Sequence, residues 1–304
     1  MIAIDLGSNT IRFLAADDLG SELWETQFVV RAAENLLQSG EISQRALDRI
    51  AAAIDEAKKQ FDFGGHGIAA VTTEAFRRAK NQRAALEFLR QKSGIVFKVI
   101  DPATEARLTA QASAEAARQR GVTGPLAVLD IGGASSEAIY LDSHIRHLVS
   151  LPLGIVTVTE LGLGKAALES HLARELKALE PFLKQCAALP RPKALIATAG
   201  TPTTLAAIKL GLDYENYDKH QVNGTPLTLT EMDAAYHKLI KTDSAKLDRL
   251  VGKNRGDLIL GGTLMLKAFV RALGFENCLV FDEGLREGVM TAALRGEFNS
   301  KYIA

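Results

Sequence analysis

Apolar and polar residues alternate in three successive runs at the start of the chain, over residues 1–7, 10–17 and 22–31. Alternation with a period of two is typical of half-buried strands. Gly7 and Gly20 separate the runs and provide the turns between them. The pattern therefore predicts an antiparallel meander of three strands.

A helical pattern follows. Ser43 is a suitable N-cap, and Leu47, Ile50 and Ile54 share one face of a helix that is expected to reach about residue 61. Further along, the pattern predicts a strand over 67–72, helical material over 74–92 and a strand over 95–100.

Asp101 and Pro102 are typical of an N-cap and the first residue of a helix. This helix is predicted to run to about residue 120, and it carries Glu105 in its opening turns. Residues 121–125 then form a turn-rich break, which is the predicted linker between two domains.

The meander recurs after this break, with strands predicted near 126–131, 136–142 and 144–151. Each copy has an apolar strand, an Asp, a turn of small residues and a second strand: Asp5-Leu6-Gly7-Ser8-Asn9-Thr10-Ile11-Arg12 and Asp130-Ile131-Gly132-Gly133-Ala134-Ser135-Ser136-Glu137. The repeat predicts two similar domains, residues 1–121 and 122–304.

The second half then becomes mainly helical. Two later strands, over 193–197 and 278–281, each run into a turn of small residues and a helix. Such a turn directs a helix N-terminus toward the place where a ligand would bind.

Composition excludes several classes of protein. Apolar residues are 47% of the 304, so the chain can bury a sizeable core. Lys plus Arg and Asp plus Glu are 36 each, so no overall field attracts nucleic acid, and no dense basic block indicates a membrane surface. No leader-like segment precedes the first strand, so we expect a cytoplasmic protein. Cys186 and Cys278 are expected to be buried, reduced thiols without a catalytic role.

The repeated turns carry the chemistry. A turn of Gly, Ser and Asn can present successive backbone N–H groups to an anion, and the Asp before it can hold a divalent metal. One copy alone is also an ordinary hairpin turn. The second copy, in register with the first, favours phosphate or nucleotide binding.

Asp130 and Glu137 are seven residues apart on the two arms of one predicted hairpin. Both carboxylates can therefore approach the turn and share a hard cation, for which Mg²⁺ is the natural candidate. The alternative is that Glu137 only pairs with an arginine across the sheet.

For Glu105, Arg77 and Arg286, a purely structural role is an alternative to a role in the site. A Glu early in a helix, such as Glu105, often only complements the helix macrodipole. Arg77 and Arg286 have forked donors that suit phosphate oxygens, but surface arginines are common.

Six blocks, in their order along the chain, resemble the exopolyphosphatase and guanosine pentaphosphate phosphohydrolase family. The resemblance spans the whole chain. The blocks are the two repeated loops together with Thr73-Glu74-Ala75-Phe76-Arg77-Arg78-Ala79-Lys80-Asn81, Glu105-Ala106-Arg107-Leu108, Ser150-Leu151-Pro152-Leu153-Gly154 and Glu283-Gly284-Leu285-Arg286-Glu287-Gly288.

This resemblance implies an α/β fold of two ribonuclease-H-like domains, as in actin, sugar kinases and heat-shock ATPases, with an interdomain active-site cleft. It also implies that Glu105 activates the attacking water, that Asp130 and Glu137 bind metal and phosphate, and that Arg77 and Arg286 lie near the phosphates. The family usually has a third glycine where this chain has Ala134. The extra methyl group puts the tightness of phosphate binding there in question.

The resulting expectation is an exopolyphosphatase that depends on Mg²⁺ or another divalent cation and releases orthophosphate from inorganic polyphosphate. Guanosine pentaphosphate 5′-phosphohydrolase is the first alternative, and a catalytically weak polyphosphate- or nucleotide-binding regulator is the second. No nucleic-acid or membrane partner is expected, and a homodimer is left open. The predicted site comprises catalytic Glu105 and Arg77, phosphate-binding Gly7, Ser8, Asn9, Arg12, Gly132, Gly133, Ser135 and Arg286, and metal-binding Asp5, Asp130 and Glu137.

Overall fold

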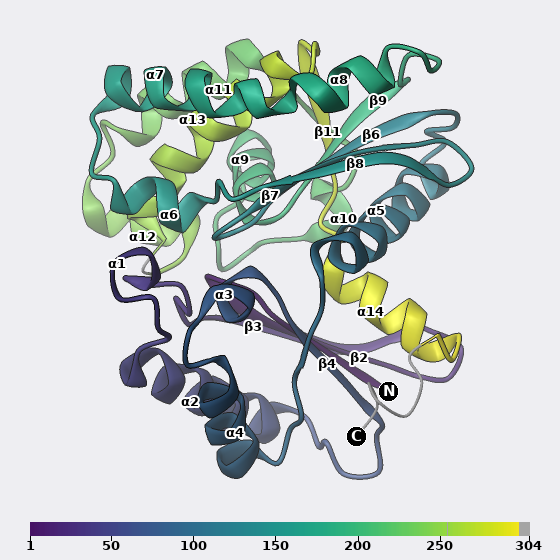
Figure 1. The fold of residues 1–304 in the computed structure, drawn as a ribbon, viewed down its shortest axis with the longest axis vertical. Helices are drawn as coiled ribbons and strands as arrows, with labels where there is room; N and C mark the ends of the chain where they lie inside the picture. The colour runs from purple at the N-terminus through teal and green to yellow at the C-terminus, as the bar shows by residue number, and fades with distance from the viewer. Residues whose placement is uncertain (254, 298–304) are drawn as a thin grey trace. The chain divides into compact units, whose positions relative to one another are not determined.

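The structure is a computed structural model that describes residues 1–253 and 255–297. It divides into two compact units (Figure 1). Unit 1 comprises Met1–Ala112 and the segment that begins at Leu285, and unit 2 comprises Ser113–Gly284. Each unit is built around one mixed β-sheet.

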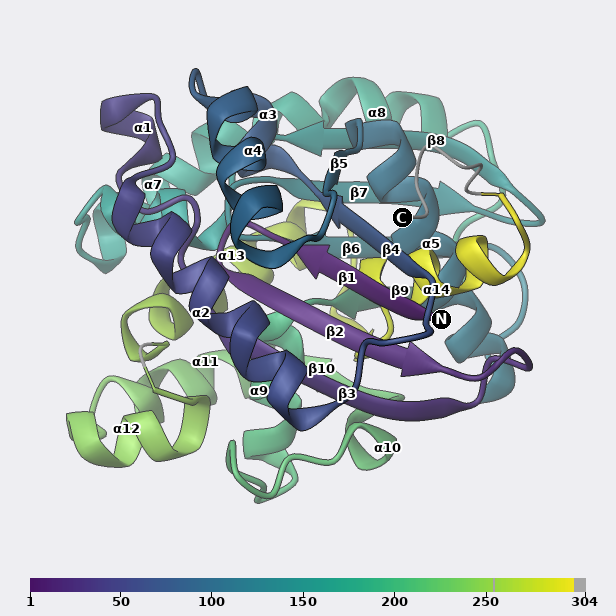
Figure 2. The ribbon, with the colours of Figure 1, turned by 90° about the horizontal axis from the view of Figure 1, so that it is seen from below.

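The sheet of unit 1 has the strand order β3-β2-β1-β4-β5 (Figure 2). Strands β1, β2 and β3 form the predicted antiparallel meander, and β4 and β5 add in parallel. The strands are β1 (Ile2–Leu6), β2 (Thr10–Ala16), β3 (Glu22–Val29), β4 (Ile68–Thr72) and β5 (Lys98–Val99). Strand β5 is thus shorter than the predicted strand over 95–100.

The helices of unit 1 cover both faces of this sheet, with α2 and α4 on one face and α14 on the other (Figure 1). They are α1 (Leu36–Ser39), α2 (Gln44–Gln60), α3 (Glu74–Arg78), α4 (Gln82–Ser93), the first part of α5 (Pro102–Gln119) and α14 (Leu285–Leu294). The predicted caps are present: the Ser43 hydroxyl accepts from the Ala46 N–H, and the Asp101 carboxylate accepts from the Thr104 N–H.

The helical material predicted over 74–92 is interrupted at residues 79–81. The side-chain amide of Asn81 donates to the carbonyl of Ile42 at 2.9 Å and accepts from its N–H at 3.0 Å. Asn81 therefore pairs with the backbone of a distant loop and holds the break in place.

The sheet of unit 2 has the strand order β10-β11-β9-β6-β7-β8. Its strands are β6 (Leu126–Ile131), β7 (Ser136–Leu141), β8 (Ile145–Leu151), β9 (Ala194–Thr198), β10 (Thr225–Thr228) and β11 (Asn277–Val280). The sequence pattern missed β10. The other elements are α6 (Ile155–Glu160), α7 (Lys165–Glu175), η1 (Leu176–Leu179), α8 (Glu180–Cys186), α9 (Gly200–Lys209), α10 (Lys219–Val222), α11 (Leu229–Leu239), α12 (Ser244–Val251) and α13 (Gly256–Ala272).

The sequence repeat is also a structural repeat. Strands β6, β7 and β8 form a second antiparallel meander, and β9 lies parallel to β6 as β4 lies parallel to β1. Asp5 is paired with Arg12, and Asp130 is paired with Glu137, at equivalent positions of the two hairpins. The chain therefore has the predicted α/β fold with two ribonuclease-H-like halves.

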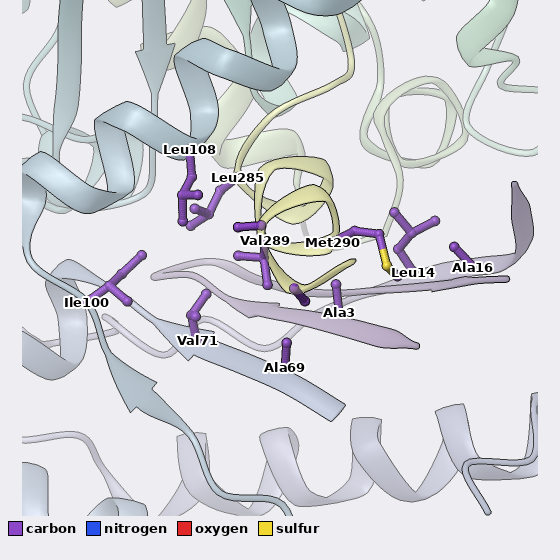
Figure 3. Close-up of a cluster of buried hydrophobic side chains, with 12 residues drawn as sticks. Ala3, Leu14, Ala16, Ala69, Val71, Ile100, Leu108, Leu285, Val289 and Met290 are labelled. Atoms are coloured by element: carbon purple, nitrogen blue, oxygen red, sulfur yellow. The ribbon is translucent and has the colours of Figure 1, made fainter. Parts of the chain in front are cut away.

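Helix α14 packs on the sheet of unit 1. Its Leu285, Val289 and Met290 face the sheet in Figure 3. The buried cluster also contains Ala3, Leu14, Ala16, Ala69, Val71, Ile100, Leu108, Ala292 and Ala293. Burying such side chains contributes about 1.5–3 kcal/mol for each large one.

This packing corrects the predicted domain division. The segment from Leu285 belongs with the first sheet, and the chain leaves unit 1 between Ala112 and Ser113, inside α5, rather than at residues 121–125. Helical periodicity reveals an apolar face on α14, but it does not reveal which sheet that face covers. Of the helices described, none is long and apolar enough to cross a membrane.

Helices α5 and α14 approach each other at a glycine. A Cβ atom at Gly288 would lie 2.3 Å from the carbonyl oxygen of Leu108, which is far closer than two such atoms can approach. Gly288→Ala is therefore expected to lower the free energy of unfolding by about 1–3 kcal/mol, as overpacking does. Denaturant unfolding measures this change.

Gly164→Ala is the matched control, because Gly164 has a φ of −66° and open space around its Cβ position. Equal stability of the Gly288→Ala and Gly164→Ala variants would contradict the close packing of α5 on α14.

Candidate active site

The first repeated loop joins β1 to β2 and places Asp5 and Arg12 side by side. These two residues are cross-strand partners, so their side chains leave the same face of the sheet. Ala3 and Leu14, two positions along each strand, are on this face and contact α14. Asp5 and Arg12 therefore project from the face over which α5 and α14 lie.

The loop leaves only some of its amides for an anion. The N–H of Gly7 donates to the carbonyl of Thr10 at 3.0 Å and closes the turn, so it is not the phosphate donor that the sequence predicts. The N–H groups of Ser8 and Asn9 donate to no acceptor within residues 1–253 and 255–297. These two amides are therefore available to an anion.

Two side chains of the loop region also have unused polar atoms. In the described part of the chain, Oδ1 of Asn9 is buried without a hydrogen-bond partner, while its Nδ2 contacts the Thr10 hydroxyl at 3.4 Å. The guanidinium of Arg12 is half-buried and makes no hydrogen bond or ion pair to any described residue. A buried polar atom without a partner is costly, so both side chains fit a ligand-binding position.

The second loop joins β6 to β7 and is built in the same way. The N–H of Gly132 donates to the carbonyl of Ser135 at 2.9 Å, so this amide also closes its turn instead of being available to phosphate. The N–H groups of Gly133, Ala134 and Ser135 have no acceptor among the residues described. The loop thus presents three consecutive amides.

Close packing against the start of α6 fixes the second loop. A Cβ atom at Gly154 would lie 2.3 Å from the amide nitrogen of Ala134, so only glycine fits there. The carbonyl of Gly133 accepts from the N–H of Val156 at 2.8 Å, and the Ser136 hydroxyl donates to the carbonyl of Leu153 at 2.7 Å. The block Ser150–Gly154 is therefore the support of this loop.

The methyl group of Ala134 is accommodated. Ala134 is 1% exposed, and its φ is not positive, so the backbone conformation does not require a glycine. The methyl lies inside the protein, and the loop keeps its free amides.

Asp130 and Glu137 are directly opposite each other on β6 and β7 and project from one face. Glu137 is 1% exposed and accepts a hydrogen bond from the Ser150 hydroxyl at 2.6 Å. Two adjacent carboxylates suit a cation such as Mg²⁺, which keeps several waters and takes its other ligands from substrate phosphates. No cluster of three or more candidate metal ligands occurs within the described residues.

Glu105 lies in the first turn of α5 and is buried, with a residue exposure of 8%. Its carboxylate accepts from Nη1 of Arg77 at 2.8 Å. Arg77 also donates to Glu74 through Nε and Nη2, and to the carbonyl of Ile100 through Nη1 at 2.7 Å. Four of the five N–H groups of Arg77 are thereby used within the protein.

A chain of hydrogen bonds connects this pair to the first loop. The Thr72 hydroxyl donates to the carbonyl of Leu6 at 2.8 Å, and the carbonyl of Thr72 accepts from the N–H of Ile100 at 3.0 Å. The carbonyl of Ile100 then accepts from Arg77, which holds Glu105. Glu105 is thus fixed at the C-terminal end of the parallel strands β1, β4 and β5, as is the loop that follows Leu6.

Burial of Arg77 tends to lower the pKa of its guanidinium, but the charge and hydrogen bonds of Glu105 and Glu74 outweigh this effect and raise the pKa above its ordinary value. Arg77 is therefore protonated at neutral pH. It positions Glu105, and it has little capacity left for the phosphate contact that the sequence predicts.

Arg286 is likewise surrounded by carboxylates. It is buried, and its Nη2 lies 2.8 Å from Oε2 of Glu25 on β3, while its Nε donates to Glu287 at 2.7 Å. These contacts tie the first turn of α14 to the edge of the sheet. The roles in phosphate binding that the sequence predicts for Arg286 and Arg12 stay predictions.

The thiols of Cys186 and Cys278 are unreactive at neutral pH. Burial raises the pKa of Cys278 to about 12 and raises that of Cys186 as well. Neither is a nucleophile at neutral pH.

The fold and the loops define the class of protein. Two ribonuclease-H-like halves, each with an Asp before a turn that exposes backbone amides, form an actin-like fold.

The comparisons then identify the family. The model of the Ppx/GppA phosphatase family matches residues 15–297, so the chain belongs to this family, whose members are hydrolases that act on phosphoanhydride bonds. The chain is 29% identical to "Exopolyphosphatase 1" of Mycobacterium tuberculosis, covering 97% of this chain and 88% of the relative.

Solved structures agree with this assignment. The crystal structure of the Ppx/GppA family member from Aquifex aeolicus has a TM-score of 0.73 and 27% identity, with 98% of each chain covered. An exopolyphosphatase from Cytophaga hutchinsonii, 21% identical over 97% of each chain, has a TM-score of 0.82 and supports the fold.

Arg77→Lys tests whether Arg77 positions Glu105. A lysine keeps the charge but cannot make four directed hydrogen bonds, so Glu105 loses its fixed place. Because small displacements of a catalytic group cost about 100-fold in rate, we expect kcat to fall by about that factor with little change in KM. Steady-state orthophosphate release gives both constants. A rise in KM at constant kcat would instead assign Arg77 to phosphate binding.

Proposed function

We propose that this protein is an exopolyphosphatase that removes the terminal orthophosphate of inorganic polyphosphate. The observation that carries the proposal is the buried carboxylate of Glu105. Arg77 holds it at the same end of the parallel strands as the first repeated loop. A protein that only binds phosphate has no need for a carboxylate fixed in this way.

In the proposed reaction, water attacks the terminal phosphorus while Glu105 accepts its proton, and the bond to the bridging oxygen breaks. In unit 1, the amides of Ser8 and Asn9 would hold phosphoryl oxygens. The second loop, in unit 2, has the amides of Gly133, Ala134 and Ser135 for the same purpose. Their fixed N–H dipoles stabilise the charge that builds up as the bond breaks, without reorganisation during the reaction.

A divalent cation would neutralise part of the phosphate charge, and Mg²⁺ fits the oxygen donors of Asp130 and Glu137. Asp5, at the equivalent place in unit 1, is a further candidate ligand. The Ser150 hydroxyl supports this role because it fixes one oxygen of Glu137 and leaves the carboxylate oriented.

Two findings favour polyphosphate over guanosine pentaphosphate. Relatives at 29% identity carry the name exopolyphosphatase. In unit 2, the guanidinium of Arg255 covers the start of α9, where a nucleoside is expected in nucleotide-binding relatives. Its Nη2 is 3.4 Å from the carbonyl oxygen of Gly200, and its Cζ is 6.0 Å from the centroid of the Tyr214 ring.

Glu105→Gln is the decisive variant, because the amide keeps the shape of the carboxylate but cannot accept a proton. We expect orthophosphate release from polyphosphate to fall by about 10²- to 10⁴-fold, the usual contribution of a general base. Binding of polyphosphate, measured by calorimetry, should persist. Glu115→Gln is the matched control, since Glu115 is an exposed residue of the same helix.

The same assay with guanosine pentaphosphate separates the alternatives. Release from guanosine pentaphosphate alone would favour the alarmone phosphohydrolase. Absence of release from either substrate, with binding intact, would favour the regulator.

Arg12→Gln tests the assignment of the phosphate-binding cation. Loss of a charged hydrogen bond, at about 1.5–3 kcal/mol, corresponds to a rise in KM of roughly 10- to 100-fold. Arg286→Gln is the contrast, since it should lower stability and leave KM near that of the parent protein. A larger KM effect at Arg286 than at Arg12 would reverse the two assignments.

A further inference from the structure

Helix α5 carries a buried threonine, Thr109, one turn after Glu105. Thr109 is 0% exposed, and its Oγ1 atom has no hydrogen-bond partner within residues 1–253 and 255–297. A buried hydroxyl without a partner is costly, so such a group marks a place where a water or ligand completes the structure.

Three other buried hydroxyls in helices of this chain are satisfied within their own helix. Each of the three donates to the carbonyl four residues earlier, which is the usual partner of a Ser or Thr inside a helix. They are Ser93 to Leu89 at 2.7 Å, Thr203 to Ala199 at 3.0 Å and Thr263 to Ile259 at 2.7 Å. Thr109 has the same opportunity at the carbonyl of Glu105 and does not use it.

The position of Thr109 indicates where its hydroxyl acts. Residues four apart lie on one face of a helix, with Cβ atoms about 5–6 Å apart, and side chains lean toward the helix N-terminus. Thr109 therefore leans over the turn that contains Glu105. Arg77 donates to the Glu105 carboxylate at 2.8 Å from outside the helix and so holds this carboxylate in place.

We propose that Thr109 and Glu105 together hold the attacking water; the proposal rests on the hydrolytic function proposed above. The water donates one hydrogen to the Glu105 carboxylate and the other to Oγ1 of Thr109, and so directs a lone pair at the terminal phosphorus. As the new P–O bond forms, the proton passes to Glu105, and the bridging oxygen leaves with the bonding electron pair on the shortened polyphosphate.

A hydroxyl can accept this hydrogen bond, whereas phosphate oxygens offer no hydrogen when fully ionised. A contact with the water acts on the chemical step, but a contact with phosphate acts on binding as well. The division of an effect between kcat and KM therefore distinguishes the two.

The test compares Thr109→Val with Thr109→Ser. Valine has the shape of threonine without the hydroxyl, and serine keeps the hydroxyl. We expect Thr109→Val to lower kcat by about 10- to 100-fold at unchanged KM, with a Tm equal to or above that of the parent protein. Thr109→Ser should keep most of the activity. Thr263→Val, which removes a buried and satisfied hydroxyl in unit 2, is the matched control and should keep the parent kcat.

Three results would overturn the proposal: a parent-like kcat in Thr109→Val, a rise in KM without a fall in kcat, or parallel losses of Tm and activity in both Thr109 variants. Failure of the underlying function is separate, because it appears as inactivity of the parent protein on both polyphosphate and guanosine pentaphosphate. If the parent cleaves only guanosine pentaphosphate, the same variants are compared on that substrate.

Discussion

The ion pair between the partly buried guanidinium of Arg77 and Glu105 is the interaction on which the rest of the candidate site depends. The guanidinium joins the helix that follows β4, the end of β5 and the first turn of α5 through Glu74, Ile100 and Glu105. Removing one partner from a buried ion pair is strongly destabilising, by about 3–5 kcal/mol, so this arrangement resists displacement. The side chain of Glu105 is thereby held in one position at the C-terminal end of the parallel strands.

Both units use the same construction at their repeated turns. An antiparallel hairpin ends in a turn whose first amide closes the loop and whose following amides remain available. Glycines at places of close packing hold the supporting elements: Gly154 against the second loop, and Gly288 where α14 crosses α5. In each unit, backbone geometry therefore leaves amides of the loop without an acceptor in the described part of the chain.

Much of this could be predicted from the sequence. The repeated Asp and turn predict the two meanders, and the cross-strand pairs of Asp5 with Arg12 and Asp130 with Glu137 follow from period-two alternation. The roles of the arginines could not be predicted, because Arg77 and Arg286 acquire partners from distant segments. The support from Thr72 and the packing of α14 on the first sheet are equally non-local, and a threonine at the end of a strand gives no distinctive signal.

The central claim is that Arg77 acts through Glu105. A double-mutant cycle of Arg77→Lys and Glu105→Gln, read out as kcat for orthophosphate release from polyphosphate, tests it most directly. If Arg77 only positions the carboxylate, the double variant will be no slower than Glu105→Gln alone. If the two losses multiply, Arg77 contributes to catalysis independently of Glu105, which would contradict a purely positioning role for this arginine.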